Sequence, residues 1–388
     1  MDASMNVAVI GAGTMGSGIA QVAAQAGHTT YLFDTRKEAV DKAVAGLTKT
    51  FDKLVEKGKV SAEEAKATLA RIVPVTDLKE LAGCGLVIEA IIEDLGVKKK
   101  LFAELEIIVS HEAVLATNTS SLSITAIAGA CATPERVIGL HFFNPAPLLP
   151  LVEVVPGLAT GSTLAMRMAT LMQAWRKVPV ICKDTPGFIV NRVARPFYGE
   201  AIRIFEEGIA DMPTIDAAMK SAGFRMGPFE LMDLIGNDIN FTVTRTVWEA
   251  FFYDPRYKPS FTQQRQVESG RLGRKSGRGY YSYADNASEP EPSTDPLLLS
   301  QISSRILVML MNEAMDALHL RIASAQDIEL AMTKGVNYPK GLLQWAGEHG
   351  LEELLRELEA LQHEYAEDRY RPSPLLRKAV REGRKTLA

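Results

Sequence analysis

The sequence predicts an α/β domain built on a doubly wound, mostly parallel sheet, followed by two all-α domains, the second a degenerate repeat of the first. A glycine-rich turn joins the first apolar strand to the first helix. Short apolar strands then alternate with helices as far as about residue 184, as a wound parallel sheet requires. Beyond that point the pattern is helical only, and its residues recur at a constant spacing.

Length and composition are those of a globular protein with more than one core. A chain of 388 residues is too long for one ordinary core. Hydrophobic residues make up 47% and charged residues 23%, which is typical of folded domains. Lysine and arginine total 43 against 47 acidic residues, so the net charge of −4 gives no general attraction to nucleic acid or to an anionic membrane. An anionic ligand must therefore be held by a local cluster of cations.

The N-terminal part begins as a βαβ unit. Residues 6–10 form a short apolar strand, residues 17–26 form a helix of small residues, and residues 30–33 form the next strand. Further strands are expected at the apolar runs 86–88, 114–116, 137–140, 151–155 and 178–181. Helices are expected between them, including residues 98–109 and 163–175. We therefore assign residues 1–184 to the first domain.

The C-terminal part is predicted as two helical domains joined by a linker. After Pro186 and Gly187 the helical stretches are interrupted by prolines and glycines, and a turn-rich segment at 273–283 ends the first set. Residues 285–296 are rich in proline, serine and glutamate, as a polar linker is. The expected helical domains are residues 185–284 and 297–388.

The two helical domains repeat the same residue types 113 positions apart. Ser304 stands where the first copy has Asn191 (304 − 191 = 113). The same interval relates Glu200 to Glu313, Ile215 to Ile328 and Ala218 to Ala331. With one inserted residue, Gly227 and Gly236 align with Gly341 and Gly350. So constant an offset indicates duplication, with mere helical similarity as the alternative. Because Ser304 replaces the asparagine, we expect the second copy to be structural.

A dinucleotide site is predicted at the first turn, whose sequence G-x-G-x-x-G is Gly11-Ala12-Gly13-Thr14-Met15-Gly16. The glycines permit a tight turn and close approach of a pyrophosphate, and the helix N-terminus offers N–H groups to the phosphates. Asp34 ends the second strand, 18 positions after Gly16 (34 − 16), where a carboxylate accepts hydrogen bonds from ribose hydroxyls. A Rossmann domain that binds NAD rather than NADP is therefore expected. Arg36 and Lys37 weaken that discrimination, and a helix cap is the alternative role for Asp34.

Four motifs then follow in order along the chain. They are TNTSSL at 117–122, LHFFNP at 140–145, LVEV at 151–154 and DTPGFIVNR at 184–192. Together they resemble the L-3-hydroxyacyl-CoA dehydrogenase family over residues 5 to about 284, and the second helical domain is similar to that of longer bacterial members, such as those of phenylacetate degradation. The resemblance implies NAD-dependent oxidation of a (3S)-hydroxyacyl-CoA to the 3-ketoacyl-CoA, in the β-oxidation of fatty acids or of adipyl-CoA. It also implies helical domains like the C-terminal domain of 6-phosphogluconate dehydrogenase.

His141 is the expected catalytic base. Oxidation of a secondary alcohol needs a base for the hydroxyl proton while the hydride leaves for the nicotinamide, and neutral imidazole titrates in the useful range. The resemblance assigns Glu153, 12 positions later (153 − 141), to orienting the imidazole. It assigns Ser120 and Asn191 to hydrogen bonds with the substrate oxygen and the histidine. Without the family resemblance, His141 would be interpreted as an ordinary core residue. Ser120 would be interpreted as a turn residue, and Asn191 as a residue at a helix N-terminus.

The resemblance also assigns contacts with the two ligands. Cofactor contacts are expected from Ser120 and from Glu93, Lys98, Asn144 and Lys275. The alternative for Lys275 is a solvated basic loop.

Three cations are expected to bind the substrate. Lys53 and Lys57, on the helix after Asp34, would hold the CoA phosphates, with a solvated helix face as the alternative. Arg195 lies one helical turn after Asn191 and could bind a terminal carboxylate bidentately. That reading favours 3-hydroxyadipyl-CoA or a similar short acyl-CoA, and the alternative is an ordinary surface arginine.

Other functional classes fit the sequence less well. A dehydrogenase family that acts on free β-hydroxyacids places a catalytic lysine three residues after the asparagine of a G-x-x-x-N segment. Gly187 and Asn191 match that segment, but the residue three positions after Asn191 is Ala194, not lysine. A catalytically silent nucleotide-binding or structural protein of the same fold would not need Ser120, His141, Glu153 and Asn191 together. No hydratase-like segment is found, so a multifunctional β-oxidation protein is not expected.

Compartment and assembly are expected as follows. Cys84, Cys131 and Cys182 are odd in number and lack metal-ligand spacing, which predicts reduced thiols in a cytoplasmic protein and no metal site. No signal peptide or membrane helix is expected. In shorter members of the family the helical domain packs against a twin subunit. We expect the second copy to cover that face in cis, so that the chain is a monomer or forms a different homo-oligomer.

Overall fold

The computed structural model describes residues 5–285, 287 and 291–386. The chain divides into two compact units, Met1–Phe188 and Ile189–Ala388. The expected linker, residues 285–296, lies partly outside the described residues. The segments on either side of that linker belong to one compact unit, so their separation into two domains stays a proposal.

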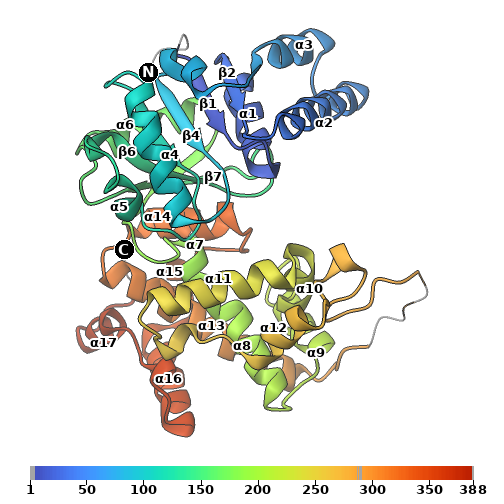
Figure 1. The fold of residues 1–388 in the computed structure, drawn as a ribbon. Helices are drawn as coiled ribbons and strands as arrows, with labels where there is room; N and C mark the ends of the chain where they lie inside the picture. The colour runs from blue at the N-terminus through green and yellow to red at the C-terminus, as the bar shows by residue number, and fades with distance from the viewer. Residues whose placement is uncertain (1–4, 286, 288–290, 387–388) are drawn as a thin grey trace. The chain divides into compact units, whose positions relative to one another are not determined.

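The first unit is organised around an eight-stranded sheet (Figure 1). Its strands are β1 (Val7–Ile10), β2 (Thr30–Phe33), β3 (Ile72–Val75), β4 (Leu86–Glu89), β5 (Val114–Thr117), β6 (Val137–Phe142), β7 (Leu151–Pro156) and β8 (Val178–Ile181). They lie in the order β3-β2-β1-β4-β5-β6-β7-β8. Neighbouring strands are parallel except for β6 and β7, which are antiparallel. The predicted doubly wound, mostly parallel sheet is confirmed.

Helices connect most of these strands. They are α1 (Thr14–Gln25), α2 (Lys37–Glu56), α3 (Ala62–Ala70), α4 (Leu95–Ile108), α5 (Ile124–Ala128) and α6 (Leu164–Ala174). Strand β3 is absent from the strands that the sequence predicted. Pro74 lies within it, and a proline weakens a strand pattern because it cannot donate to the ladder. Since β3 lies at the edge of the sheet, beside β2, the missing donor is tolerated there.

The sheet has a topological switch point at β1. From β1 the chain first builds outward through β2 and β3, and then continues on the other side through β4, β5 and β6. In such sheets the crevice for a ligand opens at the carboxyl ends of the strands where the order reverses. Gly11 directly follows β1, Asp34 follows β2, and His141 lies at the carboxyl end of β6. The fold therefore gathers predicted site residues along one edge of the sheet.

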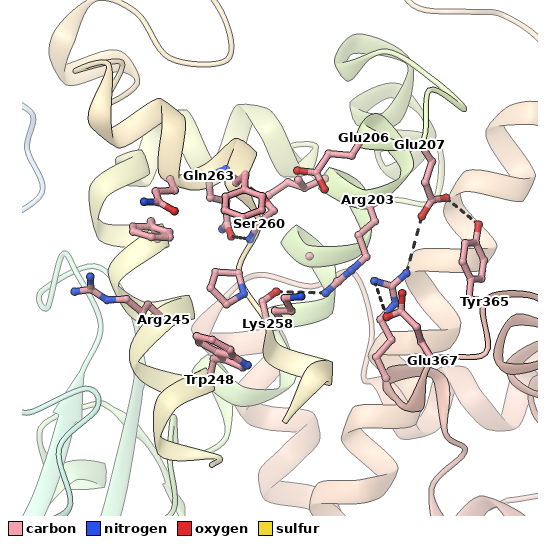
Figure 2. Close-up of a pocket in the computed structure, with 17 residues that line it drawn as sticks. Arg203, Glu206, Glu207, Arg245, Trp248, Lys258, Ser260, Gln263, Tyr365 and Glu367 are labelled. Atoms are coloured by element: carbon pink, nitrogen blue, oxygen red, sulfur yellow. Dashed lines mark hydrogen bonds and ion pairs between the residues drawn. The ribbon is translucent and has the colours of Figure 1, made fainter. Parts of the chain in front are cut away.

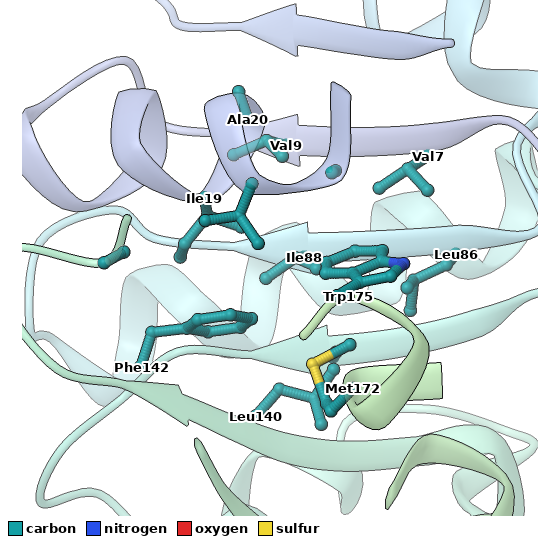
Figure 3. Close-up of a cluster of buried hydrophobic side chains, with 14 of the residues drawn as sticks. Val7, Val9, Ile19, Ala20, Leu86, Ile88, Leu140, Phe142, Met172 and Trp175 are labelled. Carbon is teal, nitrogen blue, oxygen red and sulfur yellow. The ribbon is translucent and has the colours of Figure 1, made fainter. Parts of the chain in front are cut away.

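A buried apolar cluster fixes the sheet to the helices on one of its faces (Figure 3). Val9 of β1 and Ile88 of β4 pack in the same cluster as Ile19 of α1. Met172 of α6 and Trp175, which follows that helix, complete it. Each is at most 4% exposed. Burial of side chains of this size stabilises the fold by about 1.5–3 kcal/mol each.

The second unit is helical. Its helices are α7 (Val190–Val193), α8 (Arg195–Glu206), α9 (Met212–Ser221), α10 (Pro228–Ile235), α11 (Asn237–Ala250), α12 (Phe261–Glu268), α13 (Pro296–His319), α14 (Ala325–Leu330), α15 (Leu342–His349), α16 (Leu351–Tyr365) and α17 (Pro374–Arg381). The long helix α13 packs against both α8 and α9. None of the helices among the described residues is long and apolar enough to cross a membrane.

The repeat seen in the sequence recurs in the backbone of this unit. Gly227 and Gly341 are the N-caps of α10 and α15, both in an extended conformation. Gly236 and Gly350 end the same two helices with φ of 106° and 95° and ψ of 125° and 120°. A positive φ of this size favours glycine. The glycines that align in sequence therefore begin and end the corresponding helix in each copy.

The two copies also exchange buried ion pairs. Arg192 Nε lies 2.6 Å from Glu313 Oε1, and Arg305 Nε lies 3.2 Å from Glu200 Oε2. The arginines and the glutamates are each 113 positions apart (305 − 192 and 313 − 200). Each copy thus supplies one arginine and one glutamate to the other. This is the arrangement of a self-complementary interface, in which both sides contribute the same residues.

Candidate active site

His141 and Glu153 form a buried pair on neighbouring strands. The antiparallel register of β6 and β7 places the two residues directly opposite each other. His141 Nδ1 lies 2.7 Å from Glu153 Oε2, and the two residues are 6% and 0% exposed. A carboxylate can only accept a hydrogen bond, so Nδ1 carries the proton that it donates to Glu153. In the neutral ring this leaves Nε2 as the proton acceptor.

Aromatic side chains flank the imidazole. The ring centroids of Phe143 and Phe188 lie 4.5 Å and 5.9 Å from that of His141. Phe188 is 2% exposed. These rings limit the rotation of the imidazole and exclude water from its faces. The pairing with Glu153 and this packing together hold the ring in one orientation.

The glycine turn has the geometry that a pyrophosphate needs. Gly11 has a φ of +101°, and a Cβ added there would lie 2.5 Å from the Ala90 carbonyl oxygen. A Cβ on Gly16 would lie 1.7 Å from the Gly11 carbonyl oxygen, so the start of α1 can approach β1 only without a side chain. No atom lies within 4 Å of a Cβ added to Gly13, which leaves the turn open on that side. Thr14 and Met15 begin helix α1.

Asp34 is joined to this turn by its carboxylate. The Ala12 amide donates to Asp34 Oδ2 at 2.9 Å, and the Arg36 amide donates to Oδ1 at 3.0 Å. Arg36 also lies beside it, with Nε 3.9 Å from Oδ1. The carboxylate oxygens keep lone pairs for ribose hydroxyls. The open turn, the helix N-terminus and this carboxylate fit a dinucleotide without a 2′-phosphate.

A chain of charged groups lies at the ends of β4 and β5. Lys98 is 1% exposed, and its Nζ lies 2.5 Å from Glu89 Oε1 and 3.4 Å from Glu93 Oε2. Glu89 is fully buried and also accepts a hydrogen bond from Thr117 Oγ1 at 2.7 Å. The predicted contact residue Lys98 is thus enclosed between two carboxylates, and Glu89 was not among the predicted site residues. An acidic residue at the end of an apolar strand is the signal that could have revealed it.

Glu93 connects this chain to Ser120. Glu93 Oε1 accepts hydrogen bonds from Thr119 Oγ1 at 2.6 Å, from Ser121 Oγ at 3.0 Å and from the Ser120 amide at 3.1 Å. Burial would raise the pKa of Glu93, but Lys98 and these hydrogen bonds outweigh it and lower that pKa. Glu93 is therefore ionised at neutral pH. Ser120 is half-buried beside it, and Asn144 is exposed just after β6.

A cavity of about 760 Å³ joins the glycine turn to helix α2. Ala12, Gly13 and Thr14 line one part of it, and Lys53 and Lys57 line another. Both lysines are exposed. Three further cations line the cavity and were not predicted to bind a ligand. They are Arg36, Lys42 and Lys59. The predicted dinucleotide loop and the predicted CoA lysines thus belong to one positively charged cavity.

Three predicted residues belong to the second unit. Asn191 lies in α7, half-buried. Arg195 begins α8, is 7% exposed, and donates to the Asn191 carbonyl at 2.8 Å and to Thr244 Oγ1 at 3.1 Å. Lys275 Nζ is ion-paired with Asp238 Oδ1 at 2.5 Å.

The second unit has a cavity of its own, of about 700 Å³ (Figure 2). Trp248 and Arg245 lie toward one end of the view, and Glu207 and Tyr365, which share a hydrogen bond of 2.8 Å, lie toward the other. None of the predicted site residues is among the described residues that line it. We therefore leave it out of the candidate site.

Comparison with known families covers nearly all of the chain. Residues 6–185 match the family model described as "3-hydroxyacyl-CoA dehydrogenase, NAD binding domain". The model described as "3-hydroxyacyl-CoA dehydrogenase, C-terminal domain" matches twice, at residues 187–283 and 302–388. Both helical copies therefore have the same ancestry, as the repeat indicated.

Individual relatives agree with the family models. The 3-hydroxyadipyl-CoA dehydrogenase of Escherichia coli K12 is 42% identical and is matched over 96% of each chain. Human mitochondrial hydroxyacyl-coenzyme A dehydrogenase is 41% identical over 72% of this chain and 91% of its own. The crystal structure of an E. coli 3-hydroxybutyryl-CoA dehydrogenase superposes with a TM-score of 0.93, at 42% identity, over 98% of this chain and 99% of that one.

The glycine turn with Asp34, the buried His141–Glu153 pair and two helical copies of one family domain agree with this likeness along the whole chain. The chain belongs to the 3-hydroxyacyl-CoA dehydrogenase family and is an NAD-dependent oxidoreductase of that class.

Proposed function

We propose that His141 is the general base that removes the hydroxyl proton of a (3S)-hydroxyacyl-CoA. The observation that carries this proposal is the buried pair of His141 Nδ1 and Glu153 Oε2 at 2.7 Å, which leaves Nε2 to accept the proton. Bound NAD supplies the acceptor for the hydride. Glu153 fixes the tautomer and stabilises the imidazolium that forms when the proton arrives.

Ser120 and Asn191 are proposed to hydrogen-bond the substrate oxygen and the histidine. Support for Ser120 comes from Glu93, which accepts from its amide and holds the segment after β5 in place. Support for Asn191 comes from its position in α7, where Arg195 holds its carbonyl. Both side chains can donate or accept, so they can follow the change from hydroxyl to carbonyl oxygen.

The remaining predicted contacts are proposed in the same way. Asp34 would accept from the ribose hydroxyls, with the glycine turn on the pyrophosphate. Glu93, Asn144 and Lys275 would contact the cofactor, whereas Lys98 would act through Glu93, since its ammonium is enclosed between two carboxylates.

Lys53 and Lys57 are proposed to hold CoA phosphates. Their place in the cavity of the glycine turn supports this assignment, because the substrate must bring its acyl end near the cofactor.

A direct test of the activity is NADH formation, followed by absorbance, with (S)-3-hydroxybutyryl-CoA and NAD. We expect turnover with NAD and much less with NADP, because the Asp34 carboxylate repels a 2′-phosphate. A catalytically silent protein of the same fold would bind NAD without forming NADH with any 3-hydroxyacyl-CoA. That result would overturn the proposal.

We further propose that the substrate carries a carboxylate at the far end of its acyl chain, as 3-hydroxyadipyl-CoA does. The supporting observation is that Arg195 is buried beside uncharged groups. The other buried arginines of the second unit each have a carboxylate partner, as Arg192, Arg256, Arg305 and Arg369 show. The contacts of Arg195 among the described residues are the Asn191 carbonyl, the Thr244 hydroxyl and the Tyr198 ring, all uncharged.

The surroundings of Arg195 are suited to an anion. Burial lowers the pKa of Arg195, which is the unfavourable effect that a bound carboxylate would relieve. Tyr338 interacts electrostatically with Arg195, and its buried hydroxyl has no hydrogen-bond partner among the described residues. A guanidinium and a free hydroxyl donor together can satisfy both oxygens of a carboxylate.

The test compares two substrates in one variant. Arg195→Leu should lower kcat/KM for 3-hydroxyadipyl-CoA by about 10²-fold and for 3-hydroxybutyryl-CoA by less than about threefold. Arg245→Leu, which removes an exposed arginine of the same unit, serves as the control and should leave the ratio of the two substrates unchanged. Equal losses for both substrates in Arg195→Leu would contradict the proposal.

Assembly and location are proposed from the same features. The exchanged ion pairs support the view that residues 297–388 cover in cis the face that shorter family members bury in a dimer, so that the chain is a monomer or forms a different homo-oligomer. The three cysteines are free thiols, which supports a reducing, cytoplasmic compartment.

A further inference from the structure

A second cavity, of about 500 Å³, adjoins the cavity of the glycine turn. Lys59 and Pro147 line both cavities, so the two are neighbours. The second cavity is formed by the C-terminal end of α1, by α3 and by the residues that follow α6. Among the described residues, its lining includes no residue of the glycine turn and neither Lys53 nor Lys57.

The lining of this second cavity is strongly cationic. It contains Lys59, Arg71, Arg176 and Lys177 but only one acidic residue, Glu64. The Glu64 carboxylate accepts from the Ser61 amide at 3.0 Å in the capping box of α3 and also interacts electrostatically with Arg176.

The hydrogen-bond partners of Arg71 and Lys177 are neutral. Arg71 Nη1 donates to the Ala24 carbonyl at 3.3 Å. Lys177 Nζ donates to the carbonyls of Ala146 and Leu149. No ion pair involves Arg71, Arg176 or Lys177 among the described residues. With four cations against the single carboxylate of Glu64, the cavity therefore keeps a net positive charge.

Burial of the Lys177 ammonium in this cavity destabilises the fold. Lys177 is 8% exposed, and burial lowers its pKa to about 8. A buried ammonium that only carbonyls solvate is destabilised relative to one with an anionic partner. An anion in the cavity would remove that penalty.

The two cavities together match a ligand with several phosphates. Their linings hold the eight cations Arg36, Lys42, Lys53, Lys57, Lys59, Arg71, Arg176 and Lys177, in a chain whose net charge is −4. CoA carries a pyrophosphate and, on its ribose, a separate 3′-phosphate, which NAD lacks. A phosphate monoester is the most highly charged of these groups, and arginines bind phosphate bidentately.

We propose that the 500 Å³ cavity is a subsite for the 3′-phosphate of the CoA substrate. Arg71 and Arg176 contact the phosphate oxygens, Lys59 bridges this subsite to the pyrophosphate bound nearer Lys53 and Lys57, and Lys177 supplies a fixed positive charge in the wall. The inference rests on the proposed action on CoA thioesters. It adds the residues by which the enzyme distinguishes CoA from carriers without a 3′-phosphate.

The test compares (S)-3-hydroxybutyryl-CoA with its 3′-dephospho-CoA counterpart. In the unsubstituted enzyme the missing phosphate should lower kcat/KM by about tenfold, mainly through KM. Arg71→Gln and Arg176→Gln should each lower kcat/KM about five- to tenfold for the CoA thioester and leave the dephospho substrate nearly unchanged. Arg167→Gln removes an exposed arginine of α6 that lines neither cavity, and it should affect both substrates equally and weakly.

A binding measurement separates this inference from the activity itself. Calorimetry should give tighter binding of adenosine 3′,5′-bisphosphate than of adenosine 5′-monophosphate to the unsubstituted enzyme, and Arg176→Gln should abolish the difference while NAD binding, measured as a check on folding, stays the same. Variants that weaken both substrates alike, or an enzyme indifferent to the 3′-phosphate, would overturn the subsite. Absence of turnover with every 3-hydroxyacyl-CoA would instead overturn the proposed function, whatever the calorimetry gave.

Discussion

Two fully buried carboxylates of the first unit each contact one residue of the candidate site. Glu153 binds His141, and Glu89 binds Lys98, with distances of 2.7 Å and 2.5 Å. A carboxylate in such a place is stable only while its partner stays with it. The same contact that stabilises the carboxylate therefore fixes the position of the histidine or the lysine. At Lys98 the effect extends further, because Lys98 contacts Glu93 and Glu93 contacts the Ser120 amide.

Glu89→Gln tests this chain of contacts. With one carboxylate removed, Lys98 should shift toward Glu93 and weaken the hydrogen bonds that Glu93 accepts from the segment of Ser120. We expect a loss of about 3–5 kcal/mol in the free energy of unfolding and a KM for NAD raised several-fold. Denaturant titration and steady-state kinetics measure the two effects.

The matched variant is Glu93→Gln. Its side chain is 38% exposed, so it should affect the KM for NAD with a much smaller loss of stability. If Glu89→Gln lowers stability while the KM for NAD stays unchanged, Glu89 is structural only.

Elements were predictable from the sequence where a local pattern was strong. The run 30–33 was expected as a strand and is β2. The turn at 11–16 was predicted because its glycine motif stands directly between an apolar strand and a helix, which are β1 and α1. Strand β3 escaped because Pro74 hides it, and its pairing with β2 is a contact between segments far apart in sequence. His141 could be inferred from chemistry and motif. Glu89 offered only its place at the end of an apolar strand, because its partner Lys98 and its burial exist only in the folded chain.

At the level of helices, the repeat places a buried carboxylate at the centre of each copy's contact with the other. Glu313 accepts from Arg192 at 2.6 Å, from Arg256 at 3.0 Å and from the Tyr257 hydroxyl at 2.6 Å. Glu200 has the equivalent partners, Arg305 and the Tyr370 hydroxyl. These contacts fasten α13 to α7 and to the segment after α11.

Glu313→Gln should therefore destabilise the second unit, by about 3–5 kcal/mol at pH 7, because Arg192 and Arg256 lose the more deeply buried of their two carboxylate partners among the described residues and keep only Asp316. Burial would raise the pKa of Glu313, but Arg192 and Arg256 outweigh it and lower that pKa to about 2, below the usual 4.5. The stabilisation is thus complete above about pH 4.5 and is lost as the pH falls toward 2.

Thermal or denaturant unfolding measured at pH 7 and at pH 3 checks both points. The difference between Glu313→Gln and the unsubstituted protein should shrink at the lower pH. Glu353→Gln is a suitable control, because the Glu353 side chain is 38% exposed and its partner Arg356 is exposed, and it should change stability by less than about 0.5 kcal/mol. A difference that does not depend on pH would argue against the ion pairs as its cause.

For the whole molecule, the duplication places both sides of a self-complementary contact in one chain. The apolar faces of α8 and α9 are covered by α13, which belongs to the second copy. A buried contact of this kind contributes to the stability of the fold as a core does. The second copy can thus be necessary for stability without contributing to the chemistry.

Truncation before residue 296 should expose that face. We expect the shortened chain to form homodimers or to aggregate, because α8 and α9 would seek a new partner for their apolar side chains. Light scattering with size-exclusion chromatography gives the mass, and a linker cut by an inserted protease site gives a control in which both pieces remain present. A truncated chain that stays a well-behaved monomer with full activity would contradict the structural role of the second copy.

The central claim is that His141 is the base, and the kcat of His141→Gln tests it most directly. Glutamine keeps bulk and some hydrogen bonding but cannot take the proton at neutral pH. The account predicts a fall in kcat of about 10²–10⁴-fold with (S)-3-hydroxybutyryl-CoA, while the Kd for NADH changes little. Near-normal turnover by His141→Gln, with contamination by the unsubstituted enzyme excluded, would contradict the account and require another proton acceptor.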